Sequence, residues 1–482
     1  MPHIPFISKR LVLLALVCNW LALVPPATAT ETATAASPVS SETSIAQEAG
    51  KIVSAYVKMG WFSGTVLVQN QGHTIYEQAV GLADQEQAIE NRLDTKFNLG
   101  SIAKNFTVVL TLQLVEAGKL QLDDKLSKFN LGFSSDIADK ITIEHLLTHT
   151  AGFGDIFTAE YQSNRLGYDT LAKKLTLLMN EPLLFEPGSK SRYSNYGYVV
   201  LGVILEQVSK SSFATLLEKN VFKPLHLQHT RFAPDTADKE QSLRYSLKYD
   251  GSFVFVGITE HPGPDGGIES SAGDLARFYE RLFNSDQLLS KEGVSIFKRL
   301  GKKSDYWRAF GGGLGISSAY EADFVTGYSV TVLANVDQLV AEIISGRIMD
   351  FIKTGEYSRI KQQANVFTYQ LYTRLGAEQF QEQFAASYTA AGYDGFNGRV
   401  INEVGMQLTT EARFEQAFDF FQTLVHLYPK APQAYDSLAW CYAKSGQGEL
   451  AQKIFAQALE IKPDFSSDYS VDNYQSLGAS AK

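Results

Sequence analysis

The C-terminal part of the chain contains a repeat with a period of 34 residues, and this repeat strongly limits what that part can fold into. Two stretches, 401–429 and 434–463, end at Pro429 and Pro463, which stand 34 residues apart. Small and aromatic residues recur at the same offsets: Ala417 with Ala451, Phe421 with Phe455, and Leu424 with Ala458. Such a period is typical of paired helices that must stack to bury their apolar faces. We therefore predict an all-α domain over 365–464.

The second copy resembles the tetratricopeptide repeat family. The residues that carry this resemblance are Tyr435, Leu438, Ala439, Tyr442, Ala451, Phe455, Ala458 and Pro463. The resemblance implies repeats over about 398–431 and 432–464, with helices in 365–392 completing the stack and a tail over 465–482. A generic helical hairpin is the alternative. The expected partners of such a surface are a protein or a second copy of the chain.

The first 29 residues have the features of a secretory signal peptide. Lys9 and Arg10 precede an apolar run over 11–24, and Ala-Thr-Ala follows at 27–29. This order of charge, apolar run and small residues is typical of a cleaved leader. An uncleaved anchor helix is the alternative, although the run is short and two prolines end it. We expect secretion, into a bacterial periplasm, with no membrane attachment after cleavage.

The middle of the chain mixes strand and helix patterns. Residues 30–48 are rich in Ala, Thr and Ser without periodicity, which predicts a flexible leader. Strand patterns stand at 64–84 (as a hairpin), 251–258 and 328–335, and helical patches fill most of 130–250. We therefore predict one domain over 49–357, in which a helical insertion interrupts a sheet.

Ser101 and Lys104 stand at the start of a segment, 101–117, that is apolar nearly all round and ends at Gly118. This pattern predicts a buried helix, with the serine hydroxyl at the positive end of the helix dipole. The lysine lies one turn on, on the same face, where it can take the serine proton. A capping serine with a snorkelling lysine is the alternative.

Ser-x-x-Lys alone is a weak signal, because a second copy starts at Ser295, where the pattern predicts an ordinary amphipathic helix. A Tyr-x-Asn triplet at Tyr193 and Asn195 adds to the first copy, because it precedes an apolar helix over 199–208. A tyrosine beside a charged lysine can shuttle protons, and an asparagine amide can orient a substrate carbonyl. Taken singly, Tyr193 is better explained as a core or turn tyrosine than as a functional one.

The order Ser-x-x-Lys, then Tyr-x-Asn about ninety residues later, resembles the class C β-lactamase family of serine hydrolases, which includes D-alanyl-D-alanine peptidases and esterases. The segments 141–155, 185–206 and 263–283 also resemble family segments in the right order. The resemblance covers roughly 50–355. It implies a β-lactamase/transpeptidase-like α/β (α+β) fold, with an antiparallel sheet flanked by helices and a helical subdomain.

The resemblance also implies roles for single residues. Ser101 is the expected nucleophile and Lys104 its base partner. Tyr193 is the expected proton shuttle, and Asn195 the contact to substrate and lysine. The backbone N–H of Ser101 would form half of an oxyanion hole.

The family's third motif, a basic residue followed at the third position by glycine, departs from its usual form. The sequence Lys353-Thr354-Gly355 comes after the strand over 328–335, whereas the motif should precede it, so we interpret that triplet as a decoy. Counting back from that strand leads to Phe310-Gly311-Gly312, followed by Gly313, whose amide is the expected second oxyanion donor. A phenylalanine in place of the basic residue disfavours substrates that carry a carboxylate. Arg308 is a substitute if the register is shifted.

Three functions remain open from the sequence. The first is a serine hydrolase that forms an acyl-enzyme at Ser101 and acts on an ester or amide, as an esterase or a peptidase. The second is a catalytically degenerate relative that binds a ligand or partner through its cleft and repeats. A true β-lactamase or carboxypeptidase is a third, less favoured reading.

The amino-acid composition of the chain limits the classes of partner that we expect it to bind. The chain has 482 residues with 45% apolar residues and a net charge of −9, and nucleic acid or anionic membrane would need clustered positive charge. Cys18 lies in the predicted signal peptide, so Cys441 is left without a partner for an intramolecular disulfide.

His145 and His149 have the i, i+4 spacing of metal ligands, but no acidic third ligand is evident. We expect no metal and no cofactor.

Overall fold

The computed structural model describes residues 41–232, 240–257, 260–302, 305–467 and 469, so the predicted signal peptide lies outside the described residues. The chain divides into two compact units. We call the first, which comprises 41–57, 62–245 and 255–357, the sheet unit. The second, which comprises 58–61, 246–254 and the described chain from 358 on, is the helical unit.

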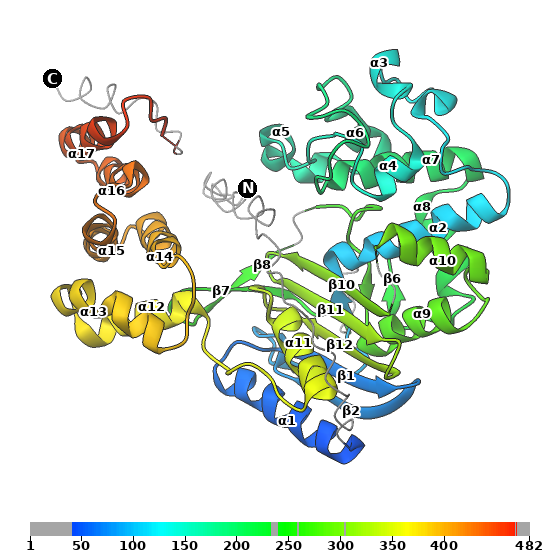
Figure 1. Ribbon diagram of the computed structural model, residues 1–482, viewed down its shortest axis with the longest axis horizontal. Coiled ribbons are helices and arrows are strands. Elements are labelled where there is room, and N and C mark those ends of the chain that lie inside the picture. The colour runs from blue at the N-terminus through cyan, green and yellow to red at the C-terminus, as the bar shows by residue number, and fades with distance from the viewer. Residues whose placement is uncertain (1–40, 233–239, 258–259, 303–304, 468, 470–482) are drawn as a thin grey trace, which may run out of the picture. The chain divides into compact units, whose positions relative to one another are not determined.

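The main sheet has five antiparallel strands in the order β10-β11-β12-β1-β2 (Figure 1). Its strands are β1 (Gly64–Asn70), β2 (His73–Val80), β10 (Tyr306–Gly313), β11 (Ile316–Asp323) and β12 (Tyr328–Ala334). Smaller sheets pair β3 (Leu82–Asp84) with β4 (Ile89–Glu90), β9 (Glu269–Ser270) with β5 (Phe97–Asn98) and β6 (Thr230–Arg231), and β7 (Arg244–Leu247) with β8 (Phe253–Val256).

The helices and helical turns of the first part of the chain lie around and between these strands. They are α1 (Glu42–Lys58), η2 (Gly100–Ile102), α2 (Ala103–Glu116), η3 (Leu126–Phe129), α3 (Ser135–Ala138), α4 (Ile143–Leu147), α5 (Ala159–Ser163), η4 (Arg165–Gly167), α6 (Leu171–Thr176), α7 (Asn195–Ser209), α8 (Phe213–Leu217), η5 (Glu218–Phe222), α9 (Ala272–Asn284), α10 (Lys291–Leu300) and α11 (Val340–Thr354). Figure 1 shows α1 and α11 on one side of the main sheet and α2, α9 and α10 on the other.

The sheet confirms the predicted hairpin and the predicted mixed architecture. Strands β1 and β2 pair antiparallel around Gln71 and Gly72, which have φ angles of 47° and 82°. Two successive positive φ angles match the twist of a tight hairpin turn. The predicted strand over 328–335 is β12, and the helical segments fall between β5 and β9 as the predicted insertion.

The predicted flexible leader over 30–48 is wrong at its C-terminal end. Helix α1 begins at Glu42, because apolar side chains recur along one face from Ile45 onward. Ile45 and Tyr56, at opposite ends of this face, are both buried. The Ala, Thr and Ser residues just before the helix concealed this periodicity.

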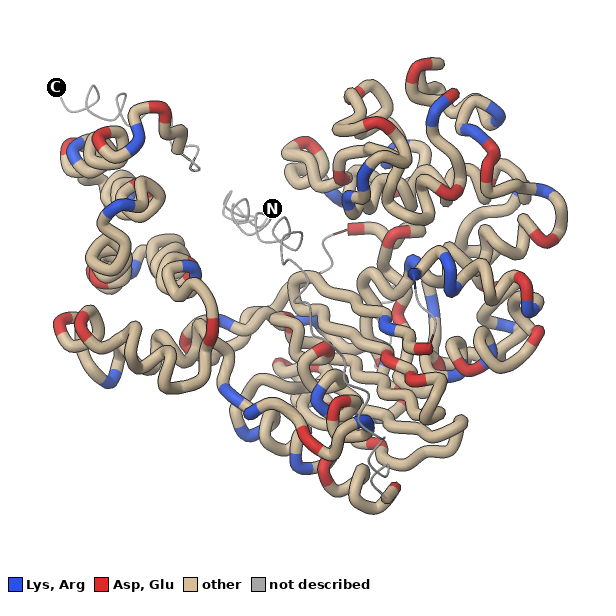
Figure 2. Tube along the Cα trace, viewed as in Figure 1, with Lys and Arg blue, Asp and Glu red and all other residues tan. Residues whose placement is uncertain are grey.

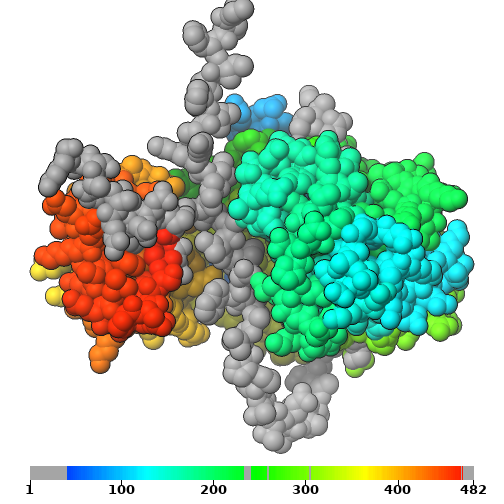
Figure 3. All heavy atoms as spheres, turned by 90° about the horizontal axis from the view of Figure 1, so that it is seen from above, coloured from blue at the N-terminus to red at the C-terminus, as the bar shows by residue number. Residues whose placement is uncertain are grey.

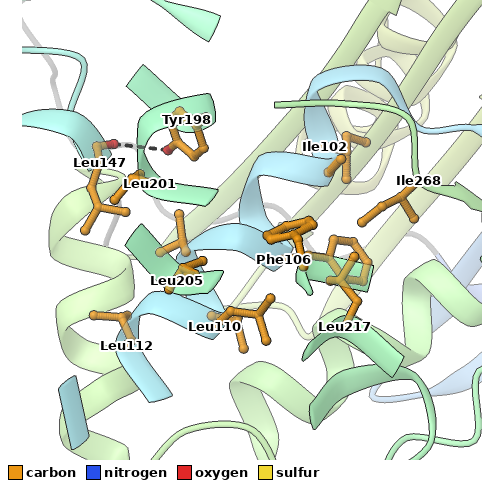
Figure 4. Packing of buried hydrophobic residues seen from close by; sticks show 14 of the residues in the cluster. Ile102, Phe106, Leu110, Leu112, Leu147, Tyr198, Leu201, Leu205, Leu217 and Ile268 are labelled. Carbon is orange, nitrogen blue, oxygen red and sulfur yellow. Dashed lines mark hydrogen bonds between the residues drawn. The ribbon is translucent and has the colours of Figure 1, made fainter. Parts of the chain in front are cut away.

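Helix α2 lies in the main apolar core, as its all-round apolar sequence predicted. Ten of its 14 residues are buried. Figure 4 shows Phe106 and Leu110 of α2 beside Leu205 of α7. Phe106 also stacks on Phe278 of α9, with ring centroids 3.9 Å apart. Replacing such a buried aromatic ring by alanine typically costs about 3 to 5 kcal/mol, so the position of α2 is strongly fixed.

The Lys353-Thr354-Gly355 triplet and the second Ser-x-x-Lys sequence, at 295–298, both belong to ordinary helices or their caps. Lys353 is in the last turn of α11, and Gly355 follows as a left-handed C-cap with φ of 77°. Lys298, in the second Ser-x-x-Lys, belongs to α10 and places its ammonium group 3.7 Å from the centre of the Phe324 ring.

The helical unit contains the predicted repeats as two helix pairs. Its helices are α12 (Ala364–Leu375), α13 (Ala377–Ala390), α14 (Gly398–Thr410), α15 (Phe414–Leu427), α16 (Pro432–Lys444) and α17 (Gly448–Ile461). Cys441 is buried in this core, where burial raises the pKa of its thiol to about 11. Thr409 Oγ1 donates to its sulfur at 3.3 Å.

The helical unit also includes a short segment from the middle of the chain, which the contiguous prediction of 49–357 assigned to the first domain. Residues 246–254, at the tip of the β7–β8 hairpin, belong to it. Tyr249 is fully buried there and donates to Glu411 Oε2 at 2.5 Å, while Arg413 donates to Tyr249 Oη at 2.7 Å. These contacts join positions more than 160 residues apart, so no local pattern could predict them.

Lys and Arg residues are interspersed with Asp and Glu residues along the described chain (Figure 2). No single helix in the described ranges is long and apolar enough to cross a membrane; α7 together with the segment Phe213–Phe222 reaches that length only across a 76° bend.

Candidate functional site

Ser101 lies in the turn η2, directly before helix α2. Gly100 has a left-handed φ of 51°, and its N–H donates to Asn98 Oδ1 at 2.9 Å. Lys104 is 5% exposed, and its Nζ donates to Ser101 Oγ at 3.2 Å. The two side chains therefore lie on one face of the helix start, as the spacing predicted.

Tyr193 brings a third functional group to Ser101 from a distant part of the sequence. Its Oη lies 2.6 Å from Ser101 Oγ across 92 residues of chain. The next residue, Ser194, is the N-cap of α7 and accepts from the N–H of Gly197. Because Tyr193 is 49% exposed, its hydroxyl can reach solvent and Ser101 together.

Asn195 and a backbone carbonyl complete the surroundings of Lys104. Lys104 Nζ lies 2.7 Å from Asn195 Oδ1 and 2.5 Å from the carbonyl oxygen of Asp265. Both oxygens can only accept hydrogen bonds. As an ammonium, Lys104 has three N–H groups, which match Ser101 Oγ and these two acceptors. In its neutral form it would keep two N–H groups for these two acceptors and present a lone pair to the Ser101 hydroxyl.

Asp155, which no sequence motif singled out, fixes the orientation of the Asn195 amide. Asn195 donates from its backbone N–H to Asp155 Oδ2 at 3.0 Å and from Nδ2 to the two carboxylate oxygens at 3.2 and 3.1 Å. Since a carboxylate accepts only, Nδ2 must face it and Oδ1 must face Lys104. The segment that ends at Asp155 is family-like, which was the one signal available.

His149 holds Tyr193 in place and is not arranged as a metal ligand. Its carbonyl oxygen accepts from Arg192 N–H at 2.9 Å, and its Nδ1 accepts from Ser194 N–H at 3.2 Å. Its ring packs on the Tyr193 ring, with centroids 4.5 Å apart. Burial, together with the charge of Lys104, lowers the pKa of His149 to about 4, so the ring is neutral at pH 7.

His145, the other histidine with the spacing of a metal ligand, helps to cap the N-terminus of helix α4. Its N–H donates to Thr142 Oγ1 at 3.2 Å, and its Nδ1 accepts from Thr142 N–H at 3.3 Å. The two residues form a capping box at the start of α4. Among the described residues there is no group of three or more metal-ligating side chains.

Strand β10 places Phe310 on the side of the sheet that faces α11, away from Ser101. In its register with β11, Phe310 lies opposite Ala319, and Arg308 lies opposite Glu321. Glu321 accepts from Ser345 of α11, which identifies that face. Side chains alternate along a strand, so Arg308 and Phe310 share the α11 face.

The opposite face of β10 contacts the loop before Ser101. Ala309 belongs to the same apolar cluster as α2, and Gly311 is two residues further on. A Cβ on Gly311 would lie 2.0 Å from Leu99 O and 2.4 Å from Ser318 Oγ. Ala309, rather than Phe310, is therefore on the side from which a basic group would approach Ser101.

Gly312 and Gly313 differ in where their amides point. Gly313 pairs with Ile316 across a two-residue turn, which favours hydrogen bonds between these two residues. Because amides alternate along an antiparallel edge strand, the N–H of Gly312 faces the free edge. This amide nitrogen would lie 3.0 Å from a Cβ on Gly100, beside Ser101. The geometry therefore favours Gly312 over the predicted Gly313 as a donor to this site.

The sequence and the fold assign the chain to a known family. The family model described as Beta-lactamase matches residues 49–337, and a Tetratricopeptide repeat model matches 408–470. The chain belongs to the β-lactamase family and has a tetratricopeptide repeat region at its C-terminal end. The members of this family include serine hydrolases and penicillin-binding proteins.

Individual relatives agree with this assignment. The chain is 30% identical to "Penicillin-binding protein 4*" of Bacillus subtilis (strain 168) over 255 residues, which is 49% of this chain and 55% of the relative. It thus spans about half the length of the curated relatives it matches.

Solved structures share the fold. A penicillin-binding protein from Bacillus halodurans superposes with a TM-score of 0.56 at 26% identity, covering 63% of this chain and 98% of that one. EstCE1, described as a hydrolase with promiscuous acyltransferase activity, gives a TM-score of 0.53 at 24% identity, covering 66% and 99%.

Proposed function

We propose that the protein is a serine hydrolase that forms an acyl-enzyme on Ser101 and acts on an ester or amide substrate. The observation that carries this proposal is the hydrogen-bonded set in which Ser101 Oγ meets both Lys104 Nζ and Tyr193 Oη. A nucleophile with an adjacent base and a second proton carrier is what acyl transfer requires. This intact set favours turnover over a purely binding role.

Acylation and deacylation can each be written with these groups. Ser101 Oγ attacks the substrate carbonyl while its proton passes to the lone pair of Lys104. Tyr193 donates its hydroxyl proton to the leaving group. In deacylation, the tyrosinate takes a proton from water, the hydroxide attacks the acyl carbon, and Lys104 returns its proton to Ser101. The cycle ends with every group in its starting state.

The negative oxygen of the tetrahedral intermediate would lie between two backbone amides. The first is Ser101 N–H, at the start of the helix, and the second is Gly312 N–H on the edge of β10. Loss of one such donor typically costs about 3 to 4 kcal/mol in transition-state stabilisation. Backbone donors need no particular side chain, so the unusual third motif can still stabilise the negative oxygen.

The substrate class follows from the face of β10 that meets Ser101. On this described strand, the inner face carries Trp307, Ala309, Gly311 and Gly313, none of which is basic. A substrate carboxylate would find no charged partner there, so neutral esters and amides are favoured over β-lactams and D-alanyl peptides. EstCE1, which shares this fold, is a hydrolase with promiscuous acyltransferase activity.

Hydrolysis of p-nitrophenyl butyrate and of nitrocefin tests the activity and the substrate class together. We expect the wild type to turn over the ester and to leave nitrocefin nearly unchanged, and Ser101→Ala to lose at least about 1000-fold in ester turnover. The matched pair Ala309→Lys and Phe310→Lys then tests the strand face. Only Ala309→Lys should improve nitrocefin turnover; improvement by Phe310→Lys alone would contradict the face assignment.

The site of action and the partners are part of the same proposal. The signal-like segment over 1–29 supports export, into a bacterial periplasm, before the enzyme acts. The tetratricopeptide region supports a protein partner or self-association. Detection of the mature chain, beginning at residue 30, in a periplasmic extract would test the first point.

A further inference from the structure

Helix α16 has buried side chains that do not belong to the core of the helical unit. Leu438 and Cys441 lie in that apolar core. Asp436, Ser437 and Trp440 are 1%, 3% and 3% exposed, yet the core cluster does not include the indole. A buried carboxylate, hydroxyl and indole on one helix need partners of matching chemistry.

The last described residues of the chain supply those partners. Ser467 Oγ donates to Asp436 Oδ1 at 2.7 Å. The Tyr469 ring stacks on the Trp440 ring, with centroids 5.3 Å apart and planes at 29°. Ser437 Oγ donates to the carbonyl oxygen of Gln433 at 3.0 Å within α16, so Tyr469 Oη, which lies 2.8 Å from Ser437 Oγ, donates to it. Figure 3 shows this part of the helical unit as the orange-to-red surface.

These contacts are made by side chains rather than by the backbone, so they discriminate between peptides of different sequence. A hydroxyl residue must meet the carboxylate, and an aromatic residue two positions later must meet the indole. Stacked aromatic pairs contribute about 0.5 to 1.5 kcal/mol beyond their buried area, and a hydrogen bond to a charged group about 1.5 to 3 kcal/mol.

We propose that Asp436, Ser437 and Trp440 form a peptide-binding face, and that Ser467 and Tyr469 of the chain's own C-terminal segment occupy it. The partner that fits this face is an extended peptide with a Ser or Thr two residues before a Tyr. Helix α17 ends at Ile461, so the tether to Ser467 is short. A short tether holds the segment at an effective concentration near the millimolar range, which suppresses weaker competitors.

Peptide binding by the full-length chain tests this proposal. The probe is a fluorescein-labelled peptide of residues 463–470, PDFSSDYS, and the measurement is fluorescence anisotropy. The full-length double variant Ser467→Ala/Tyr469→Ala should bind it at least about tenfold more tightly than the wild type. Ser466→Ala, which changes an exposed neighbour, is the matched control and should behave as the wild type.

Two results would overturn the proposal. One is equal affinity of the double variant and the wild type for the peptide. The other is peptide binding by the double variant that survives the addition of Trp440→Ala.

A second measurement does not depend on the affinity of the free peptide. Tyr469→Ala should expose Trp440, so acrylamide should quench its fluorescence more strongly than in Ser466→Ala, after subtraction of a Trp440→Phe background. No difference would also overturn the proposal. Neither readout uses catalysis, so the outcome is independent of the proposed hydrolase function.

Discussion

Ser101 Oγ and Tyr193 Oη lie 2.6 Å apart although 92 residues separate them in the sequence. The contact depends on how α2 and α7 pack, because Ser101 precedes the first helix and Tyr193 the second. Both helices are largely buried, which fixes their starts relative to one another. The proposed nucleophile and the proposed proton carrier are thus positioned by the core of the sheet unit, and we expect residues that hold those helix starts to control the rate.

Asp155 is the first such residue. Asp155→Asn replaces an acceptor-only carboxylate by an amide, so one of its N–H groups faces the Asn195 Nδ2 group. Asn195 then loses its fixed orientation, and Lys104 loses a well-placed acceptor. We predict a fall in kcat of about 10- to 100-fold on p-nitrophenyl butyrate, with KM changed much less. Unchanged kcat in a folded variant would mean that Asp155 does not orient the amide.

His149 gives the site a defined pH dependence of stability. Its pKa is lowered from 6.5 to about 4 in the folded chain, so the unfolded chain binds more protons between these values. Stability is therefore full above pH 6.5 and falls as the pH drops toward 4, by about 3 kcal/mol in total.

The His149→Asn variant isolates this contribution, because an asparagine oxygen can replace Nδ1 as acceptor but does not titrate. Urea unfolding at pH 7 and pH 4.5 should show a larger loss for the wild type than for the variant. If the free energy of unfolding falls by the same amount in the wild type and in the variant between pH 7 and pH 4.5, His149 is not held neutral in the folded chain.

Gly311 should be intolerant of any side chain. A Cβ there would lie 2.0 Å from the carbonyl oxygen of Leu99, so β10 or the loop before Ser101 must move. We predict that Gly311→Ala lowers kcat/KM by at least about 100-fold, since misplacement by about 1 Å can cost that much.

Gly313→Ala is the matched control for this variant. It lies on the same face of the strand, and its nearest neighbour would be Ile316 Cδ1 at an ordinary 3.4 Å. Measurement of kcat/KM on p-nitrophenyl butyrate distinguishes Gly311→Ala from Gly313→Ala. Circular dichroism checks that both variants are folded. Equal losses in both variants would contradict the close approach at Gly311.

Local patterns predicted the parts of the site that lie close together in sequence. The apolar sequence of α2 predicted a buried helix. The spacing of Ser101 and Lys104 then placed the serine hydroxyl and the lysine ammonium on one face at its start. Tyr193 and Asn195 needed the family resemblance, because only the packing of α7 against α2 brings them to the lysine. Asp155 and His149 act through contacts with residues about 40 positions away, which no periodicity encodes.

The strand register was the main feature that the sequence left ambiguous. A run of three glycines preceded by Ala309 and Phe310 allows two registers, and each register turns the opposite set of side chains toward the site. The structure resolves this through the contact of Gly311 with Leu99. The conclusion that a basic group is missing from this face survives, but the position that would carry it is Ala309.

The central claim is that Ser101 becomes acylated. Intact-mass spectrometry after treatment with a fluorophosphonate, or after rapid quenching of the p-nitrophenyl butyrate reaction, measures this directly. We predict one covalent adduct per chain in the wild type, mapped by peptide sequencing to Ser101, and none in Ser101→Ala. An unmodified wild type, or an adduct that persists in Ser101→Ala, would contradict the account.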